Sequence, residues 1–241
     1  MGAQRWLQLG WIQIQPSEIM KIALILALAS YFHGRTIEEL KTIRYMLTPL
    51  AMVFAPMFLV LRQPDLGTAV MLGLGGAAVF FVAGTALRYF AVGAGVTLAG
   101  IPTAWQFLET YQQERIVTFL NPDADPLGAG YHIIQSKIAL GSGGLLGRGY
   151  MQGTQSHLSF LPEHQTDFIF TMLAEEFGMV GALILIGLYT AVFIYGLVIS
   201  ARCSNHFGRL LGAGLTTTLF LYVYINIAMV IGIIPVVGVP L

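Results

Sequence analysis

Long apolar runs constrain the fold of this chain more than any other feature. A helix needs roughly 20 apolar residues to cross a bilayer core of about 30 Å, and six runs near that length occur at about 16–33, 46–61, 66–84, 89–107, 168–200 and 208–235. Hydrophobic residues make up 56% of the chain and charged residues only 10%, whereas an average soluble domain has about 25% charged residues. The sequence therefore predicts an all-α, polytopic transmembrane helical bundle with about six spans.

One of these runs is too long for a single crossing. Residues 168–200 exceed one span and include the adjacent acids Glu175 and Glu176, so an interfacial or re-entrant helical turn is expected before the span itself. The segment of about 108–167 is the only sizeable stretch outside the predicted spans, and it holds most of the polar groups. We therefore expect a single membrane domain, residues 1–241, with one large extracytoplasmic loop at about 108–167.

Charge patterning gives the expected orientation and excludes one class of partner. The formal net charge is zero, so the chain has no basic surface of the kind that recruits nucleic acid. Basic residues are dense in three short loops, 33–45, 85–89 and 201–209, and short loops carry the most weight in the positive-inside rule. We assign these loops to the cytoplasm, which places the segment 108–167 on the outer face.

Three acidic residues stand where predicted helices enter the membrane from the outer face. Glu18, Asp65 and Asp167 lie in "QPSEIMK", "RQPDLGT" and "PEHQTDF", and each is expected in the first turn of its helix. A structural interpretation is that the helix macrodipole stabilises each carboxylate by about 0.3–1 kcal/mol. A functional interpretation is that they line a polar cavity, because a charge at bilayer depth costs on the order of 2.5–3.5 kcal/mol. Lys21 and Arg62, near Glu18 and Asp65 in the sequence, favour the second interpretation.

The residue types around these acids suit phosphate chemistry. Arg5, Lys21 and Arg62 could neutralise an anionic group, and guanidinium groups match phosphate oxygens well. Asp167 could accept a proton from an attacking hydroxyl or help to bind a divalent cation. The set fits transfer onto a hydroxyl with a phosphate-bearing leaving group, but it also fits a transporter of an anionic lipid or a proton-coupled carrier. The residues alone leave that choice open.

Two other motifs favour structural interpretations. The stretch "GSGGLLGRG" (141–149) matches neither GxxxxGK[ST] nor GxGxxG, and no predicted strand precedes it. We interpret it as a flexible loop beside a short amphipathic helix at 132–140. His157, Glu163 and His164 carry metal-ligand side chains but lack the helical H-x-x-x-H spacing. A histidine metal site is therefore not favoured.

Polar and small residues inside the apolar runs are expected to serve helix packing. The glycines of 73–84 suit close contacts between helices. Asn226 and the threonines at 216–218 are expected to bond across helices or back to backbone carbonyls, because a polar side chain in an apolar run needs a partner.

Five motifs in fixed order give the chain a family resemblance. They are "GAQRWL", "QPSEIMKIALILALA", "RQPDLGTA", "NPDADPLGAGYHIIQSKIALGSGGLLGRG" and "LPEHQTDFIFTMLAEEFGMVG". Together they resemble the SEDS family (shape, elongation, division and sporulation). The sequences of "RQPDLGT" and of the glycine-rich motif are more similar to the RodA branch of this family than to the FtsW branch. The resemblance covers essentially every residue of the chain.

The resemblance implies a peptidoglycan glycosyltransferase that polymerises lipid II at the outer face of the bacterial cytoplasmic membrane during cell elongation. The essential acid of the family's "HTDF" motif corresponds to Asp167, while Gln165 departs from the usual order and leaves His164 one place early. Asp167 is the implied base that deprotonates the 4-hydroxyl of the acceptor GlcNAc, which attacks C1 of the donor MurNAc and releases undecaprenyl pyrophosphate. The implied substrate-binding or supporting residues are Arg5, Glu18, Lys21, Arg62, Asp65, Glu163 and His164.

The resemblance also implies partners and leaves alternatives. Expected partners are lipid II, the lipid-linked glycan strand, a class B penicillin-binding transpeptidase and the rod-shape (elongasome) membrane proteins, with Mg²⁺ or Mn²⁺ able to bind at Asp167 and no organic cofactor. The resemblance implies a family fold of about ten spans, each a helix of roughly 20 apolar residues, so the chain is expected to be a fragment that lacks the first spans and the C-terminal end. A lipid II flippase, or a non-catalytic scaffold for the transpeptidase, are the alternatives. A flippase would need polar residues at the membrane midplane, which the runs nearly lack.

Overall fold

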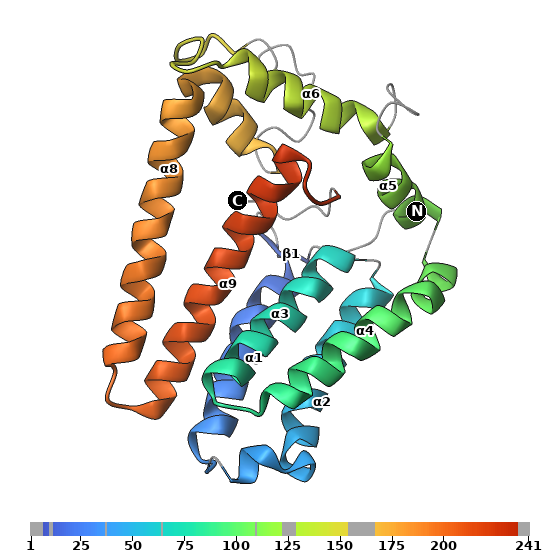
Figure 1. Ribbon diagram of the computed structural model, residues 1–241, viewed down its shortest axis with the longest axis vertical. Helices are drawn as coiled ribbons and strands as arrows, with labels where there is room; N and C mark the ends of the chain where they lie inside the picture. Colours follow the sequence, from blue (N-terminus) through green and yellow to red (C-terminus); the bar gives the residue numbers. More distant parts are fainter. Residues whose placement is uncertain are drawn as a thin grey trace. The chain divides into compact units, whose positions relative to one another are not determined.

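The protein is largely helical, which confirms the predicted fold class. The computed structural model describes residues 7–9, 12–36, 38–63, 65–108, 110–121, 129–153 and 167–235 (Figure 1). The one sheet within these ranges is an antiparallel hairpin of β1 (Leu7–Leu9) and β2 (Ile12–Ile14). The chain divides into two compact units, which we call unit 1 (residues 1–94 with 192–221) and unit 2 (residues 95–191 with 222–241).

Three helices that lie side by side form the centre of unit 1 (Figure 1): α1 (Pro16–His33), α2 (Ile43–Arg62) and α3 (Leu66–Val82). Pro16 occupies the start of α1, where its fixed φ suits the first helical turn. A short 3₁₀ helix, η1 (Glu39–Lys41), connects α1 to α2. The bundle thus places the starts of α1 and α3 in the same unit.

The core of unit 1 is apolar and closely packed. Its buried cluster includes Leu28, Phe32, Val79 and, from α9 (His206–Ile231), Leu210. A Cβ on Gly76 would lie 2.8 Å from Cγ2 of Val53. The prediction that glycines of 73–84 let helices approach closely is therefore confirmed at Gly76.

Within the described residues, three helices are long and apolar enough to cross a bilayer. They are α2, α8 (Ile169–Arg202) and α9 (His206–Ile231). Helices α1, α3 and α4 (Leu87–Phe107) occupy the other three predicted runs, and α3 is a shorter apolar helix. A polytopic membrane bundle follows from these lengths and compositions.

Unit 2 contains α5 (Thr110–Leu120), α6 (Ala129–Ser142), the first part of α8 and the last part of α9. Helix α6 confirms the helix predicted at 132–140 and extends it at both ends. The backbone of α8 breaks at Gly178, where φ is 65° and ψ is −164°, and α8 bends there in Figure 1. The break confirms the prediction of a separate helical segment ahead of the span, and this segment contains Glu175 and Glu176.

The glycine segment 143–149 is docked onto this break and is not the flexible loop predicted. Its backbone donates from Arg148 N to the Glu175 carbonyl at 3.0 Å and from Gly149 N to the Glu176 carbonyl at 3.0 Å. In return, its carbonyls accept from Met179 N at 2.9 Å and Val180 N at 3.1 Å. A break in a helix frees backbone groups that need partners, and this segment supplies them. The glycines serve close backbone approach, which their spacing alone does not reveal.

Candidate functional site

Asp167 lies immediately ahead of the first helical segment of α8. It is 7% exposed, and α8 begins two residues later at Ile169. The Phe168 carbonyl accepts from Thr171 N at 3.0 Å and from Met172 N at 3.3 Å, so the helical ladder starts at Phe168. The prediction that Asp167 stands in the first turn is therefore wrong. Its position still places it near the positive end of the helix dipole.

The backbone of Asp167 is held from another helix. Asn226 of α9 is fully buried, and its Nδ2 donates to the Asp167 carbonyl oxygen at 2.9 Å, across 59 residues of sequence. This confirms that Asn226 bonds across helices. The signal in the sequence was a lone amide in an apolar run, because a buried amide requires a partner. The pattern could not identify Asp167 as that partner.

A second polar connection links α6, α8 and α9. The Ser136 hydroxyl of α6 donates to the Val230 carbonyl of α9 at 3.0 Å and lies 3.2 Å from the Thr171 hydroxyl of α8. Ser136, Thr171 and Glu175 all have no exposed surface. Sequence analysis missed this connection, since a single hydroxyl in a helical segment is too common to be a signal.

Asp65 in unit 1 caps a helix. It is the N-cap residue of α3, and its carboxylate accepts from Thr68 N at 3.1 Å and from the Thr68 hydroxyl at 3.0 Å. It therefore precedes the first turn instead of lying within it. For Asp65 the structural interpretation of the acid is confirmed, since this is the standard geometry of an N-cap.

Glu18 and Lys21 form an ion pair one turn apart at the start of α1. Glu18 lies in the first turn, as predicted, and the Lys21 Nζ donates to Glu18 Oε1 at 2.7 Å. Asp65 is close enough to Lys21 for their charges to interact. The structure thus brings Glu18, Lys21 and Asp65 together, so that two carboxylates lie near one buried ammonium group.

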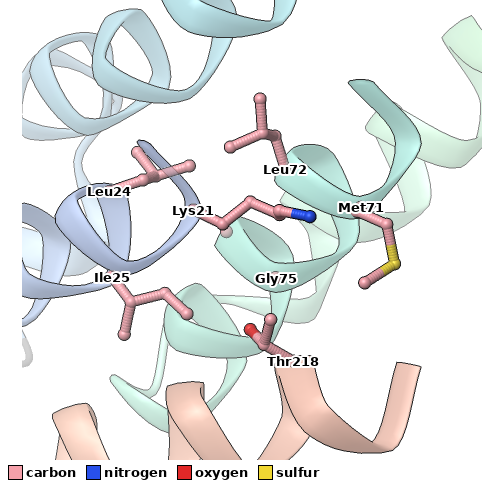
Figure 2. A pocket seen from close by; sticks show the side chains of 8 residues that line it. Lys21, Leu24, Ile25, Met71, Leu72, Gly75 and Thr218 are labelled. Atoms are coloured by element: carbon pink, nitrogen blue, oxygen red, sulfur yellow. The ribbon is translucent and has the colours of Figure 1, made fainter. Parts of the chain in front are cut away.

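The surroundings of Lys21 are tightly filled. Lys21 is 4% exposed, and Figure 2 shows its amine end beside α3. The space around it has no room for a substrate group and is lined by Leu24, Ile25, Met71, Leu72, Gly75, Gly76 and Thr218. Within this unit, the Lys21 charge serves the contact between α1 and α3.

The remaining predicted residues are placed differently. Arg62 ends α2 and is exposed, with its guanidinium carbon 5.0 Å from the centre of the Phe58 ring. Arg5, Glu163 and His164 lie outside the described residues. The described part of the chain holds no group of three His, Cys, Asp or Glu side chains that could bind a metal ion. Divalent cation binding therefore stays a prediction.

Comparison with known proteins identifies a matching family and similar relatives. The profile of the family described as cell cycle protein, which groups FtsW, RodA and SpoVE, matches residues 1–241. The chain is 51% identical over 241 residues to the peptidoglycan glycosyltransferase MrdB of Escherichia coli strain K12, and the match covers all of this chain and 65% of that protein. The chain thus spans less than two thirds of the length of this relative.

Solved structures show the same likeness. One similar structure is a chain of a peptidoglycan synthase complex that coordinates polymerization and crosslinking, with a TM-score of 0.83 and 33% identity over 100% of this chain and 66% of that one. Another is the rod shape determining protein RodA of Thermus thermophilus, with a TM-score of 0.65 and 29% identity over 99% of this chain and 60% of that one.

Proposed function

The chain belongs to the cell cycle protein family of FtsW, RodA and SpoVE, and on that premise we propose that the whole protein is a peptidoglycan glycosyltransferase. The observation that carries the proposal is the 51% identity, over the full 241 residues, to a relative named as a peptidoglycan glycosyltransferase. Its proposed substrate is lipid II, polymerised at the outer face of the cytoplasmic membrane. More specifically, we propose a role in cell elongation and rod shape, because the motif sequences resemble the RodA branch of the family.

Asp167 is the proposed general base. Its carboxylate takes the proton of the 4-hydroxyl of the acceptor GlcNAc, the freed oxygen forms a bond to C1 of the donor MurNAc, and the bond from C1 to undecaprenyl pyrophosphate breaks. This is one inverting displacement, and the leaving group carries away the electron pair. Asp167 is 7% exposed and lies ahead of α8, which supports the role, because a general base must be held in a fixed position near the reacting hydroxyl.

Neutralisation of the leaving pyrophosphate is the second requirement. A positioned base typically contributes 10²–10⁴-fold, so much of the acceleration must come from orientation and charge. We assign this role to two basic residues of the motifs, Arg5 and Arg62, and we propose that Lys21, Glu18 and Asp65 support it only indirectly, through the ion pair and the helix cap at the starts of α1 and α3. Glu163, His164 and a divalent cation remain proposed additions to the substrate site.

The proposed partner is a class B penicillin-binding transpeptidase. A similar solved structure comes from a synthase complex that couples polymerization to crosslinking, which supports a crosslinking enzyme as the partner of the whole protein. The other rod-shape membrane proteins are proposed partners only because the motif sequences resemble those of the RodA branch.

The test is glycan polymerisation from purified lipid II by the full-length protein together with its transpeptidase. We expect polymer from the parent and none above background from Asp167→Asn, because an amide keeps the size of the side chain but cannot take the proton. Glu176→Gln, in the same helical segment, is the matched control and should retain activity. Equal transpeptidase binding by all three proteins shows that they are folded.

Each alternative outcome has a clear meaning. If the parent makes no polymer with its partner present, the protein is not a polymerase, and transport of lipid II across vesicles becomes the next assay. If Asp167→Asn polymerises at the parental rate, the enzyme assignment stands but Asp167 is not its base.

A further inference from the structure

Asn226 lies outside the five sequence motifs named above, yet its side chain binds the backbone of Asp167. It has no exposed surface, and it donates to the Asp167 carbonyl oxygen at 2.9 Å. A buried amide in an apolar helix is unfavourable unless its hydrogen bonds are formed. Its bond to Asp167 therefore helps to offset the cost of burying this amide where α9 meets the start of α8.

The Asn226 amide donates to a carbonyl that is not part of the hydrogen-bond ladder of α8. In a continuous α-helix, the Asp167 carbonyl would accept from the N–H four residues later, which is that of Thr171. The Thr171 N–H donates instead to the Phe168 carbonyl at 3.0 Å. The ladder of α8 thus does not fix the backbone of Asp167, and the Asn226 amide takes the place of the missing donor.

The same face of α9 carries a second anchor. Val230 lies four residues after Asn226, so the two share a helix face, and the Val230 carbonyl accepts from the Ser136 hydroxyl at 3.0 Å. Ser136 also lies 3.2 Å from the hydroxyl of Thr171, one helical turn beyond Asp167. The connection from α9 to Thr171 therefore runs through Ser136 of α6, whereas Asn226 contacts Asp167 directly.

We propose that Asn226 is a positioning residue for the glycosyl transfer, which holds the Asp167 carbonyl and thereby fixes the point from which the Asp167 carboxylate reaches the acceptor hydroxyl. The inference rests on the proposed function, since it requires Asp167 to be the base. A misplacement of about 1 Å in a reacting group can cost about 10²-fold in rate. Loss of the Asn226 donor is therefore expected to lower kcat, while lipid II is still bound.

The experiment compares two substitutions in the full-length protein with its transpeptidase. Asn226→Leu keeps the approximate volume and removes the donor, whereas Asn226→Gln keeps an amide donor on a longer arm. We expect Asn226→Leu to lower kcat about 10–100-fold with KM changed by less than about threefold, and Asn226→Gln to recover part of the loss. If Asn226→Leu does not fold, Asn226→Ala, which adds no bulk, takes its place.

Ser136→Ala is the matched control, because it removes a buried hydrogen bond to α9 without removing the one to Asp167. It should lower the melting temperature and leave kcat per folded enzyme near the parental value. An equal fall in kcat for Ser136→Ala and Asn226→Leu at equal loss of melting temperature would overturn the inference, as would an unchanged kcat for a folded Asn226→Leu. Activity retained by Asp167→Asn marks the separate failure of the proposed base.

Discussion

At the start of α3 the Asp65 carboxylate accepts two hydrogen bonds from Thr68, whereas at the start of α8 the bond from Asn226 goes to the backbone carbonyl of Asp167. Both aspartates precede an apolar helix, and both are 7% exposed. In unit 1 the carboxylate is used to begin a helix. In unit 2 the helix begins at the Phe168 carbonyl, and the backbone of the acid is fixed from α9. One sequence pattern thus gives a helix cap in one place and, in the other, an acid whose backbone is held by a second helix, which is the proposed base.

Substitution of both aspartates by asparagine tests this difference most strongly. An amide in place of the Asp167 carboxylate cannot take a proton, so we expect Asp167→Asn to lower kcat by about 10²–10⁴-fold. Asparagine is as good an N-cap as aspartate, so Asp65→Asn should lower kcat by less than about tenfold. Polymerisation of lipid II by the full-length protein measures both. Equal losses for the two variants would remove the distinction between cap and base.

Glycine substitutions test how the two units use left-handed backbone. Gly147 in unit 2 has a φ of +82°, and a Cβ there would overlap the Glu176 carbonyl; Gly84 in unit 1 has a φ of +84° and nothing within 4 Å of a Cβ. We expect Gly84→Ala to cost about 1–2 kcal/mol of unfolding free energy, and Gly147→Ala about 2–5 kcal/mol, since overpacking against backbone adds to the strain.

Thermal unfolding in detergent checks this pair, because both variants lose the same conformational freedom and only one meets backbone atoms. The difference between the two melting temperatures isolates the docking of the glycine segment onto α8. Melting temperatures that fall equally would show that this segment is the flexible loop that its sequence predicts.

Sequence analysis predicted the helical class, a separate segment ahead of the α8 span and the polar bonding of Asn226, because these follow from residue periodicity and from the cost of burying a polar group. The docking of 143–149 could not be predicted in the same way. Its hydrogen bonds to Glu175 and Glu176 are made by backbone atoms. Every residue type has these backbone atoms, so the sequence does not indicate which residues form such bonds.

The placement of the acids shows a similar limit. An acid near a predicted helix start fits the N-cap, the first turn or the residue before the cap equally well, and helix boundaries are the least certain part of a sequence prediction. Glu18 falls in the first turn, Asp65 at the cap and Asp167 ahead of it. Tertiary contacts, such as that from Asn226 to Asp167, decide between these positions.

Removal of the Asp65 carboxylate is expected to lower the unfolding free energy by a smaller amount, and it tests what this acid does in unit 1. Asp65→Ala loses the bonds from the Thr68 N–H and hydroxyl, and loss of an N-cap typically costs about 0.5–2 kcal/mol. Asp65→Asn should be nearly neutral. Chemical or thermal unfolding of the three proteins measures the difference. A loss in Asp65→Asn as large as that in Asp65→Ala would show that the charge beside Lys21, and not the cap, is what stabilises this end of the bundle.

The smallest expected effect concerns an acid outside the spans. Glu39 in η1 accepts from Thr36 N at 2.9 Å and pairs with Arg35, whose Nη1 lies 3.4 Å from Glu39 Oε1. The backbone hydrogen bond from Thr36, together with the charge of Arg35, lowers the pKa of Glu39 below its usual value near 4.5. Like Asp65, Glu39 is an acid whose carboxylate is bound by a nearby N–H, but its side chain is partly exposed to solvent.

The sign of the pH dependence follows from that direction. A carboxylate with a lowered pKa in the folded state contributes stability at pH values above the unfolded pKa, and the contribution is lost as the pH falls through the folded pKa. Glu39→Gln should therefore melt slightly below the parent at neutral pH, and the gap should close below about pH 4.5. Glu38→Gln is the matched control, since Glu38 is the neighbouring acid and no described residue donates a hydrogen bond to its side chain. A gap that persists at low pH would mean that the loop, and not the ionised carboxylate, is altered by the substitution.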